Sequence, residues 1–201
     1  MAKKSYFKED LPSKIKDTFN IDKMDNKWAL KRITIRYNGL FDFDSMYSGL
    51  TDWAKNYEYR WHEKSYKHKV PSPKGAEQEY SWLLEKEVND FVKYTVMVDA
   101  KAENLNEVKI DLGDGNIKTL FNAKIEIIIN GTIEFDWQSK FKGGRWAELL
   151  GPLYMKLMNK EFEIIYGDQL YYRVWNLHAM FKQFLDMSSK HHAYKGMAGD
   201  E

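Results

Sequence analysis

The feature that most constrains the fold is a long alternation of apolar and polar residues that begins at position 117. In a β-strand, residues two apart point to the same face, so this pattern predicts a strand of about a dozen residues with one buried side. The segment continues to Asn130-Gly131, a pair typical of tight hairpin turns. The residues expected on the buried side are Ile117, Thr119, Phe121, Ala123, Ile125 and Ile127.

The Asn130-Gly131 pair allows two hairpin registers. A two-residue type I′ loop would pair Ile127 with Glu134, which sets a carboxylate against an isoleucine. A three-residue loop with Gly131 at positive φ instead pairs Ile127 with Ile133 and collects the apolar residues on one face. We expect the second register. Its buried face would hold Ile125, Ile127, Ile133, Phe135 and Trp137.

Residues 77–104 allow two interpretations. Tyr80, Leu84, Val88 and Phe91 sit at helical spacing, yet the stretch also alternates as a strand does. A three-residue loop at 89–91 would form a hairpin that pairs Val88 with Val92, Leu84 with Val96 and Trp82 with Val98. We favour this hairpin and leave a helix over 77–90 as the alternative. Together with "EVKIDL" and the "GDGN" turn that follows it, four or five long antiparallel strands are expected between residues 77 and 141.

Other elements flank this meander. A first strand is expected in "WALKRITIRYNG", and an exposed, charged strand in "YEYRWHEKSYKHKV" that stops at Pro71 and Pro73. Asp44 or Ser45 would cap a short helix between them, with Met46, Leu50, Trp53 and Tyr57 on one side. Asp168 would cap a long C-terminal helix. Its apolar stripe comprises Leu170, Val174, Leu177, Phe181 and Phe184.

These elements predict an α+β fold, a long antiparallel meander with a short N-terminal helix and long C-terminal helices packed on one face. We divide the chain into a charged N-terminal arm (1–27), a single domain (28–187) and a flexible tail (188–201). The arm would carry one short amphipathic helix on Leu11, Ile15 and Phe19.

Composition excludes several classes of function. The formal net charge of +1 argues against a nucleic-acid binder, which usually needs a basic surplus. The absence of cysteine excludes disulfides, thiolate catalysis and cysteine-based zinc sites. No apolar run approaches the roughly 18–20 residues of a membrane helix. The first residues are charged and carry no signal-peptide core, so we expect a cytoplasmic protein.

No catalytic, metal or cofactor motif stands out. His62 and His68 lie too far apart along a strand to form a metal pair, and His191-His192 is expected in solvent. "FDFD" at 41–44 could bind a hard cation, but its second aspartate suits a helix cap better. "DLGDGN" lacks the length of a calcium loop. Glu126 and Glu134 form a candidate acid–base pair, on the wet face.

The aromatic residues are the one feature of the sequence that stands out as a candidate binding site. They could line a cavity for an apolar ligand, or they could simply form a packed core. The set comprises Trp61, Tyr80, Trp82, Phe121, Phe135 and Trp137 on expected strands, with Trp146, Tyr171, Trp175 and Phe181 on expected helices.

The order of elements over residues 28–187 resembles the helix-grip fold of the START and Bet v 1-like (SRPBCC) superfamily. The resemblance lies in topology alone, and no short motif carries functional residues across. A helix before the terminal one, in "GRWAELLGPLYMKLM", and the N-terminal arm depart from that fold. The resemblance implies a cavity between the sheet and the long helix that admits a small hydrophobic molecule.

Three hypotheses follow. The first is non-catalytic binding of a small apolar ligand, with no cofactor. The second is an interaction or assembly protein with a solid core, acting as a homo-oligomer or with a protein partner. The third is an enzyme of the cyclase or hydratase kind. For the first, the expected ligand-binding residues are Phe121, Phe135 and Trp137 from the sheet, and Tyr171, Trp175 and His178 from the helix.

Overall fold

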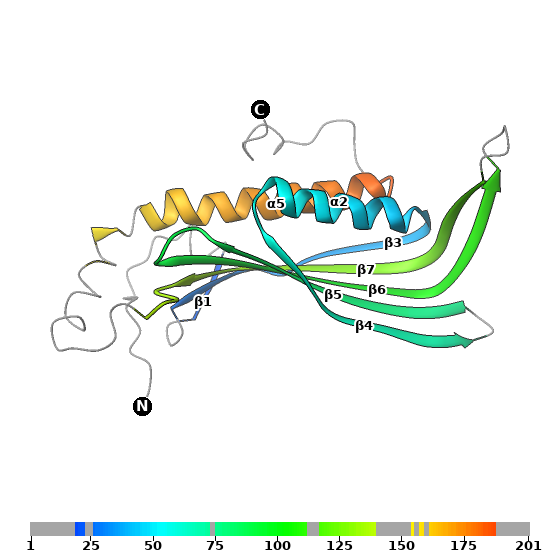
Figure 1. The fold of residues 1–201 in the computed structure, drawn as a ribbon, viewed down its shortest axis with the longest axis horizontal. Helices are drawn as coiled ribbons and strands as arrows, with labels where there is room; N and C mark the ends of the chain where they lie inside the picture. The colour runs from blue at the N-terminus through cyan, green and yellow to red at the C-terminus, as the bar shows by residue number, and fades with distance from the viewer. Residues whose placement is uncertain are drawn as a thin grey trace. The chain divides into compact units, whose positions relative to one another are not determined.

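A computed structural model describes residues 19–22, 26–72, 75–111, 117–139, 154, 157–158 and 161–187. They form strands, helices and one π-helical turn, coloured along the chain in Figure 1. In order these are β1 (Phe19–Asp22), β2 (Lys27–Leu30), β3 (Ile33–Phe41), α2 (Phe43–Asn56), β4 (Arg60–Ser72), β5 (Gly75–Glu87), β6 (Val92–Asp111), β7 (Ile117–Phe135), η1 (Phe162–Gly167) and α5 (Asp168–Phe184).

The fold is α+β, an antiparallel sheet with helices packed on one face, as the sequence predicts. The strand order is β1-β2-β7-β6-β5-β4, and β3 also pairs with β7. The chain divides into two compact units. The first unit comprises residues 1–32, 85–96 and 130–174, and the second comprises 33–84, 97–129 and 175–201.

The predicted hairpin at Asn130-Gly131 is wrong. Strand β7 runs without a break through both residues, and Gly131 is not among the glycines with positive φ. Its partners are β3 and β2 instead: Ile127 lies opposite Ile35, and Ile133 lies opposite Trp28. The expectation of one buried face is correct for Ile125, Ile127, Ile133 and Phe135, whereas Trp137 lies beyond the strand and is half-buried.

Charge pairing explains why the long strand is favoured over the hairpin. The hairpin would set Glu126 against Glu134, whereas the observed pairing sets Glu126 against Arg36 and Glu134 against Lys27. The Arg36 Nε–Glu126 Oε1 distance is 2.7 Å, and the Lys27 Nζ–Glu134 Oε1 distance is 3.6 Å. A like-charge penalty is thereby replaced by two opposite-charge pairs.

The predicted first strand is two strands, β2 and β3. From Ala29 to Ile33 the chain advances four residues, while their partners on β7, Thr132 and Ile129, are three residues apart. One extra residue is therefore accommodated around Lys31, as in a β-bulge. The division between the two units falls at the same place.

Strands β5 and β6 form the predicted hairpin, and residues 77–87 are strand rather than helix. The Val88 N–H donates to the Val92 carbonyl at 3.0 Å. The Asn89 side chain accepts from the N–H groups of Phe91 and Val92, which closes the loop. The expected four or five strands are three longer ones, because β6 continues through Asn104, which takes a left-handed conformation at φ 56°.

Strand β4 is the exposed, charged strand that was expected. It lies at the end of the strand order, and the side chains of residues 62–69 are all exposed. It extends through Pro71 to Ser72. Proline has no N–H to donate to a ladder, so an edge position is where a strand tolerates it.

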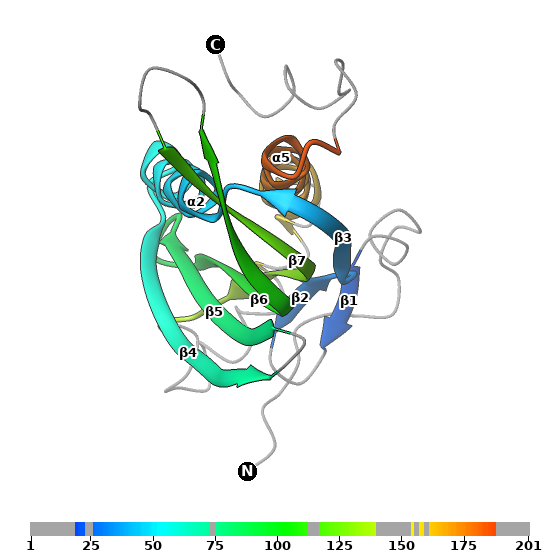
Figure 2. The same ribbon diagram turned by 90° about the vertical axis from the view of Figure 1, so that its right-hand side faces the viewer.

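The two helices bury the predicted stripes. Met46, Leu50 and Trp53 of α2 are buried. On α5, Leu170 and Val174 are fully buried in the first unit, as are Leu177 and Phe181 in the second, while Phe184 is half-buried. In the second unit the two helices lie on the same side of the strands (Figure 2). The Trp53 Nε1–H donates to Asn176 Oδ1 at 3.0 Å and links them.

Asp168 does not cap α5, because the π-helical turn η1 leads directly into it. The hydroxyl of Tyr94 donates to the carbonyl of Tyr166 at 2.9 Å and approaches Gln169 Oε1 at 3.2 Å. A helix carbonyl that accepts from a side chain departs from the regular ladder, and such insertions are a cause of helix irregularity.

Gly131 sits where α5 touches β7 within the first unit. A Cβ at Gly131 would lie 2.8 Å from Leu30 Cδ1 and 3.1 Å from Val174 Cγ2. Helix and strand are therefore in direct contact there, and the glycine is needed for close approach rather than for a turn.

Several predictions fall wholly or partly outside the described residues. These are the arm helix on Leu11 and Ile15, the "DLGDGN" turn, the helix in "GRWAELLGPLYMKLM" and the tail with His191-His192. Phe19–Asp22, assigned to the arm, forms strand β1 and pairs with β2. Among the described residues, no helix is both long and apolar enough to cross a lipid bilayer.

We predict that Gly131→Ala destabilises the protein by about 1–3 kcal/mol, because the added methyl overpacks the contact with Val174. Chemical denaturation monitored by circular dichroism measures the change. The double variant Gly131→Ala/Val174→Ala is the matched control, since it removes the Val174 methyl groups, one of the two contacts that the added Cβ would overpack. The double variant should lose less stability than the sum of the two single variants. An unchanged unfolding midpoint for Gly131→Ala would contradict the close contact.

Candidate functional site

Phe135, one of the six expected ligand-binding residues, lies in the core of the first unit. It is 2% exposed, and its ring centroid lies 4.9 Å from those of Trp28 and Phe162. Phe91 stacks on Phe162 at 5.7 Å and is also buried. These four rings are all buried, as in a packed aromatic core, and the half-buried Tyr154 and Tyr166 contact Phe162 at its edge.

Trp137 and Tyr171 occupy other places in the first unit. The Trp137 Nε1–H donates to the Asn89 carbonyl at 3.0 Å, and Lys93 Nζ lies 5.8 Å from the Trp137 ring centroid. The Trp137 indole thus stabilises the turn between β5 and β6 through this hydrogen bond. Tyr171 contacts Tyr172 edge to face on α5.

Trp175, His178 and Phe121 belong to the second unit. The rings of Trp175 and His178 meet edge to face at 4.9 Å, one helical turn apart. Burial, with the like charge of Lys182, lowers the pKa of His178 from its ordinary 6.5. Phe121 lies 6.2 Å from Phe43 of α2. The structure brings Trp175 and His178 together, and Phe121 joins a different group of residues.

That group is a continuous set of aromatic side chains in the second unit, which we call the aromatic cluster. Residues from one helix and three strands contribute to it. Its members are Phe43 and Tyr47 of α2, Trp61 and Tyr66 of β4, Tyr80 and Trp82 of β5, and Phe121 of β7.

Tyr80 is at the centre of the aromatic cluster. Its ring centroid lies 4.9 Å from those of Phe43 and Tyr66, and 5.3 Å from that of Trp82. Tyr47 contacts Trp82 edge to face at 5.9 Å. Trp82 is fully buried and Tyr66 is 49% exposed, so the cluster runs from the interior to the surface. The other members are half-buried.

The start of α2 is held by an N-cap that sequence analysis placed two or three residues too late. Asp42, not Asp44 or Ser45, is the cap: its Oδ1 accepts from the Ser45 N–H at 3.0 Å. Lys118 Nζ lies 2.8 Å from Asp42 Oδ2 and ties the helix to β7. This arrangement fixes Phe43 and, one turn later, Tyr47.

Electrostatics in the aromatic cluster favour neutral phenols. Burial raises the pKa of Tyr80, and so do Tyr66, Glu63 and Asp44. Burial also raises the pKa of Tyr47, with a contribution from Glu63. Both hydroxyls are therefore protonated at neutral pH and act as hydrogen-bond donors. The Tyr80 hydroxyl donates to Gln78 Oε1 at 2.8 Å.

Two indole N–H groups of the aromatic cluster are also buried. The Nε1 atoms of Trp61 and Trp82 have no hydrogen-bond partner among the residues that the structure describes. Both rings meet Tyr47 edge to face, at 5.6 Å for Trp61 and 5.9 Å for Trp82. Buried donors of this kind are uncommon and cost stability, and an acceptor on a bound molecule would satisfy them.

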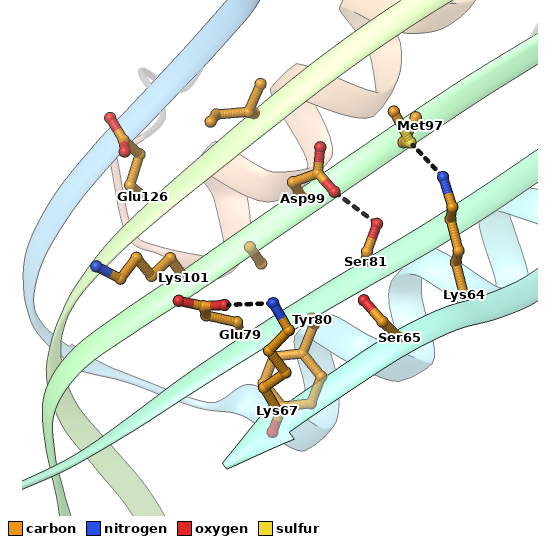
Figure 3. Close-up of a pocket in the computed structure, with 12 residues that line it drawn as sticks. Lys64, Ser65, Lys67, Glu79, Tyr80, Ser81, Met97, Asp99, Lys101 and Glu126 are labelled. Carbon is orange, nitrogen blue, oxygen red and sulfur yellow. Dashed lines mark hydrogen bonds and ion pairs between the residues drawn. The ribbon is translucent and has the colours of Figure 1, made fainter. Parts of the chain in front are cut away.

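A second candidate is a groove of about 460 Å³ on the face of the second unit that is turned away from α2 (Figure 3). Polar and charged side chains line most of it. The lining residues are Lys64, Ser65, Lys67, Glu79, Tyr80, Ser81, Met97, Asp99, Ala100, Lys101, Glu126 and Ile128.

Most charges in this groove are paired within the sheet. Lys67 Nζ lies 3.5 Å from Glu79, and Lys101 Nζ lies 2.7 Å from Glu103 and 3.0 Å from Glu77. The Ser81 hydroxyl donates to Asp99 at 2.6 Å. Cross-strand pairs of this kind fix strand register and keep the face solvated. The groove therefore presents a balanced polar face rather than a set of converging catalytic groups.

The remaining candidates from the sequence do not assemble. His62 and His68 are exposed on β4, as expected. Glu126 and Glu134 lie on the same strand, eight positions apart, and each faces a basic residue. Among the described residues, no group of three histidines or carboxylates could hold a metal ion.

Sequence analysis selected four members of the aromatic cluster as cavity candidates but missed three. Phe43 and Tyr47 stand four apart on α2, and this spacing could have identified them as one face of the helix. Tyr66 lies among the exposed, otherwise polar residues 62–69 of β4, so it gave no apolar alternation.

No known family model matches this chain, and no curated protein matches it in sequence.

We predict that Asp42 makes the stability of the protein depend on acid pH. Burial opposes ionisation, but the hydrogen bonds from Lys118 and Ser45 outweigh it and lower the pKa of Asp42 from 3.8 to about 2. The ionised form thus stabilises the fold above pH 3.8, and this contribution is lost as the pH falls toward 2. It should amount to about 2 kcal/mol in denaturant unfolding measured across this range.

Asp42→Asn is the matched control, because it keeps an acceptor for the Ser45 N–H but has no charge for Lys118. We expect it to be less stable than the native chain at neutral pH and to lose less stability on acidification. Equal pH dependence in the two proteins would contradict the role of Asp42.

Proposed function

We propose that this chain is a non-catalytic binding protein whose aromatic cluster holds a small apolar ligand. The observation that carries the proposal is the contrast between the two groups of aromatic residues. In the first unit, the rings of Trp28, Phe91, Phe135 and Phe162 are all buried, and Tyr154 and Tyr166, which contact Phe162, are half-buried. In the aromatic cluster only Trp82 is fully buried, and the set reaches the surface at Tyr66.

Aromatic rings that remain half-exposed offer flat apolar area for a ligand to cover. The tyrosine hydroxyls and the indole N–H groups supply the few polar contacts that orient such a ligand. The proposal keeps the ligand class expected from the sequence and moves the site from α5 to α2. The direct contact of α5 with β7 at Gly131 favours this move, since it leaves no space at that point.

We also infer that the fold is a helix-grip fold. An antiparallel sheet with helices on one face supports this assignment. In such a fold the space between sheet and helices is where a ligand would bind, and the aromatic cluster lies between α2 and strands β4, β5 and β7.

A second candidate function is protein assembly. The side chains of Leu157, Ile164 and Ile165 in the first unit are 73%, 64% and 49% exposed. Exposed aliphatic residues that are close in sequence are typical of a contact surface. Sedimentation of the native chain against Ile164→Glu/Ile165→Glu would reveal this function as a loss of mass in the variant.

Fluorescence titration with N-phenyl-naphthylamine, a neutral apolar probe that brightens in apolar sites, tests the ligand proposal. We predict saturable binding that Tyr66→Ala weakens about 2- to 10-fold, because one stacking face is lost. Tyr66 is half-exposed, so its replacement should leave the fold intact. Fatty acids, isoprenoids and flat aromatic compounds can then be ranked by displacement of the probe.

Tyr171→Ala is the matched control, because it removes a tyrosine from the site that the sequence placed against α5. Binding unaffected by Tyr66→Ala but weakened by Tyr171→Ala would place the ligand at that site and contradict the proposal. No saturable binding of any probe would leave assembly as the better function.

A further inference from the structure

Two carboxylates flank the aromatic cluster. Glu63 lies two residues after Trp61 on β4, so it points to the same side of the strand. Asp44 follows Phe43 in the first turn of α2. Both side chains are exposed, and neither forms an ion pair with another residue in the described part of the chain.

The opposite face of the second unit differs, because several of its carboxylates are paired. Glu77, Glu79, Glu103 and Glu126 on the opposite face each lie within 4.0 Å of a lysine or arginine nitrogen. Lys118 of β7 already forms an ion pair with Asp42, with 2.8 Å between Lys118 Nζ and Asp42 Oδ2. The side of the unit that carries the aromatic cluster therefore has negative charge that its own described residues leave uncompensated.

The charge of both carboxylates reaches the aromatic cluster. Glu63 contributes to the raised pKa of Tyr80 and of Tyr47, after burial, and Asp44 contributes to that of Tyr80. Both carboxylates therefore act on the Tyr80 hydroxyl, and the faces of the neighbouring rings are the negative side of an aromatic quadrupole.

We propose that the ligand of the aromatic cluster is a small organic cation that carries an alkylated ammonium group. This inference rests on the proposed function, since it names the ligand class of the same site. The rings attract a cation through their faces, and alkyl groups on nitrogen fit apolar surface better than a hydrated ammonium does. Glu63 and Asp44 add long-range attraction at the rim.

A metal ion does not fit this site. Hard cations need several oxygen ligands at close range, and no group of three carboxylates or histidines gathers among the described residues. A neutral apolar ligand would use the rings but would gain nothing from Glu63. The unpaired carboxylates therefore favour a cation over a neutral molecule of the same shape.

Calorimetric titration with choline and with its uncharged carbon isostere, in which a tert-butyl group replaces the trimethylammonium group, tests the inference. We expect choline to bind at least about tenfold more tightly, and this preference should shrink as salt is added. Equal affinity for the two compounds would overturn the cation inference and leave apolar binding in place. If neither they nor the naphthylamine probe bound, the proposed function would fall as well.

Substitutions separate charge from shape. Glu63→Gln should weaken choline binding about fivefold and leave the isostere unaffected, since only the coulombic attraction is removed. Asp44 also lies near the positive end of the α2 dipole, so Glu63 gives the cleaner test. Asp52→Asn removes the same charge from a later turn of α2, where Asp52 faces Lys55, and should change neither affinity. A Glu63→Gln variant that binds choline normally would overturn the inference.

Discussion

Strand β7 buries a continuous apolar face from Ala123 to Phe135, and neighbouring elements pair with that strand or cover it. Because apolar and polar side chains alternate along the strand without interruption, a shift of one residue in its pairing register would expose every buried isoleucine to solvent. The pairs with Arg36 and Lys27 on the other face hold the register. At Gly131 the strand has no side chain, which allows α5 to lie directly on it.

Much of the secondary structure could be predicted from periodicity. The alternation of β5, β6 and β7, the charged edge strand β4 and the apolar stripe of α5 all appear as expected. The error at Asn130-Gly131 has a physical cause. A local turn preference is worth little against pairing with a distant strand, and the partners on β2 and β3 lie about a hundred residues earlier in the chain. Sequence spacing does not reveal such partners.

The candidate site was harder to predict for a related reason. Alternation along a strand and spacing along a helix identify which face of its own element a residue occupies. They do not say which faces of different elements pack together. Phe121 and Phe135 share one face of β7, yet Phe121 contacts Phe43 of α2, whereas Phe135 contacts Trp28 of β2. Only the tertiary arrangement shows that most rings around Phe135 are buried, whereas most rings of the aromatic cluster are half-buried and the cluster reaches the surface at Tyr66.

The central claim is that the aromatic cluster is where this chain binds its ligand. Indole N–H signals in a two-dimensional nitrogen–proton spectrum test it most directly, because each of the seven tryptophans gives its own peak. On separate titrations with choline and with N-phenyl-naphthylamine, the account predicts shifts at Trp61 and Trp82, whose N–H groups have no described partner. The peaks of Trp28 and Trp137 should stay in place. Shifts confined to Trp175, or no saturable shift at any tryptophan, would contradict the account.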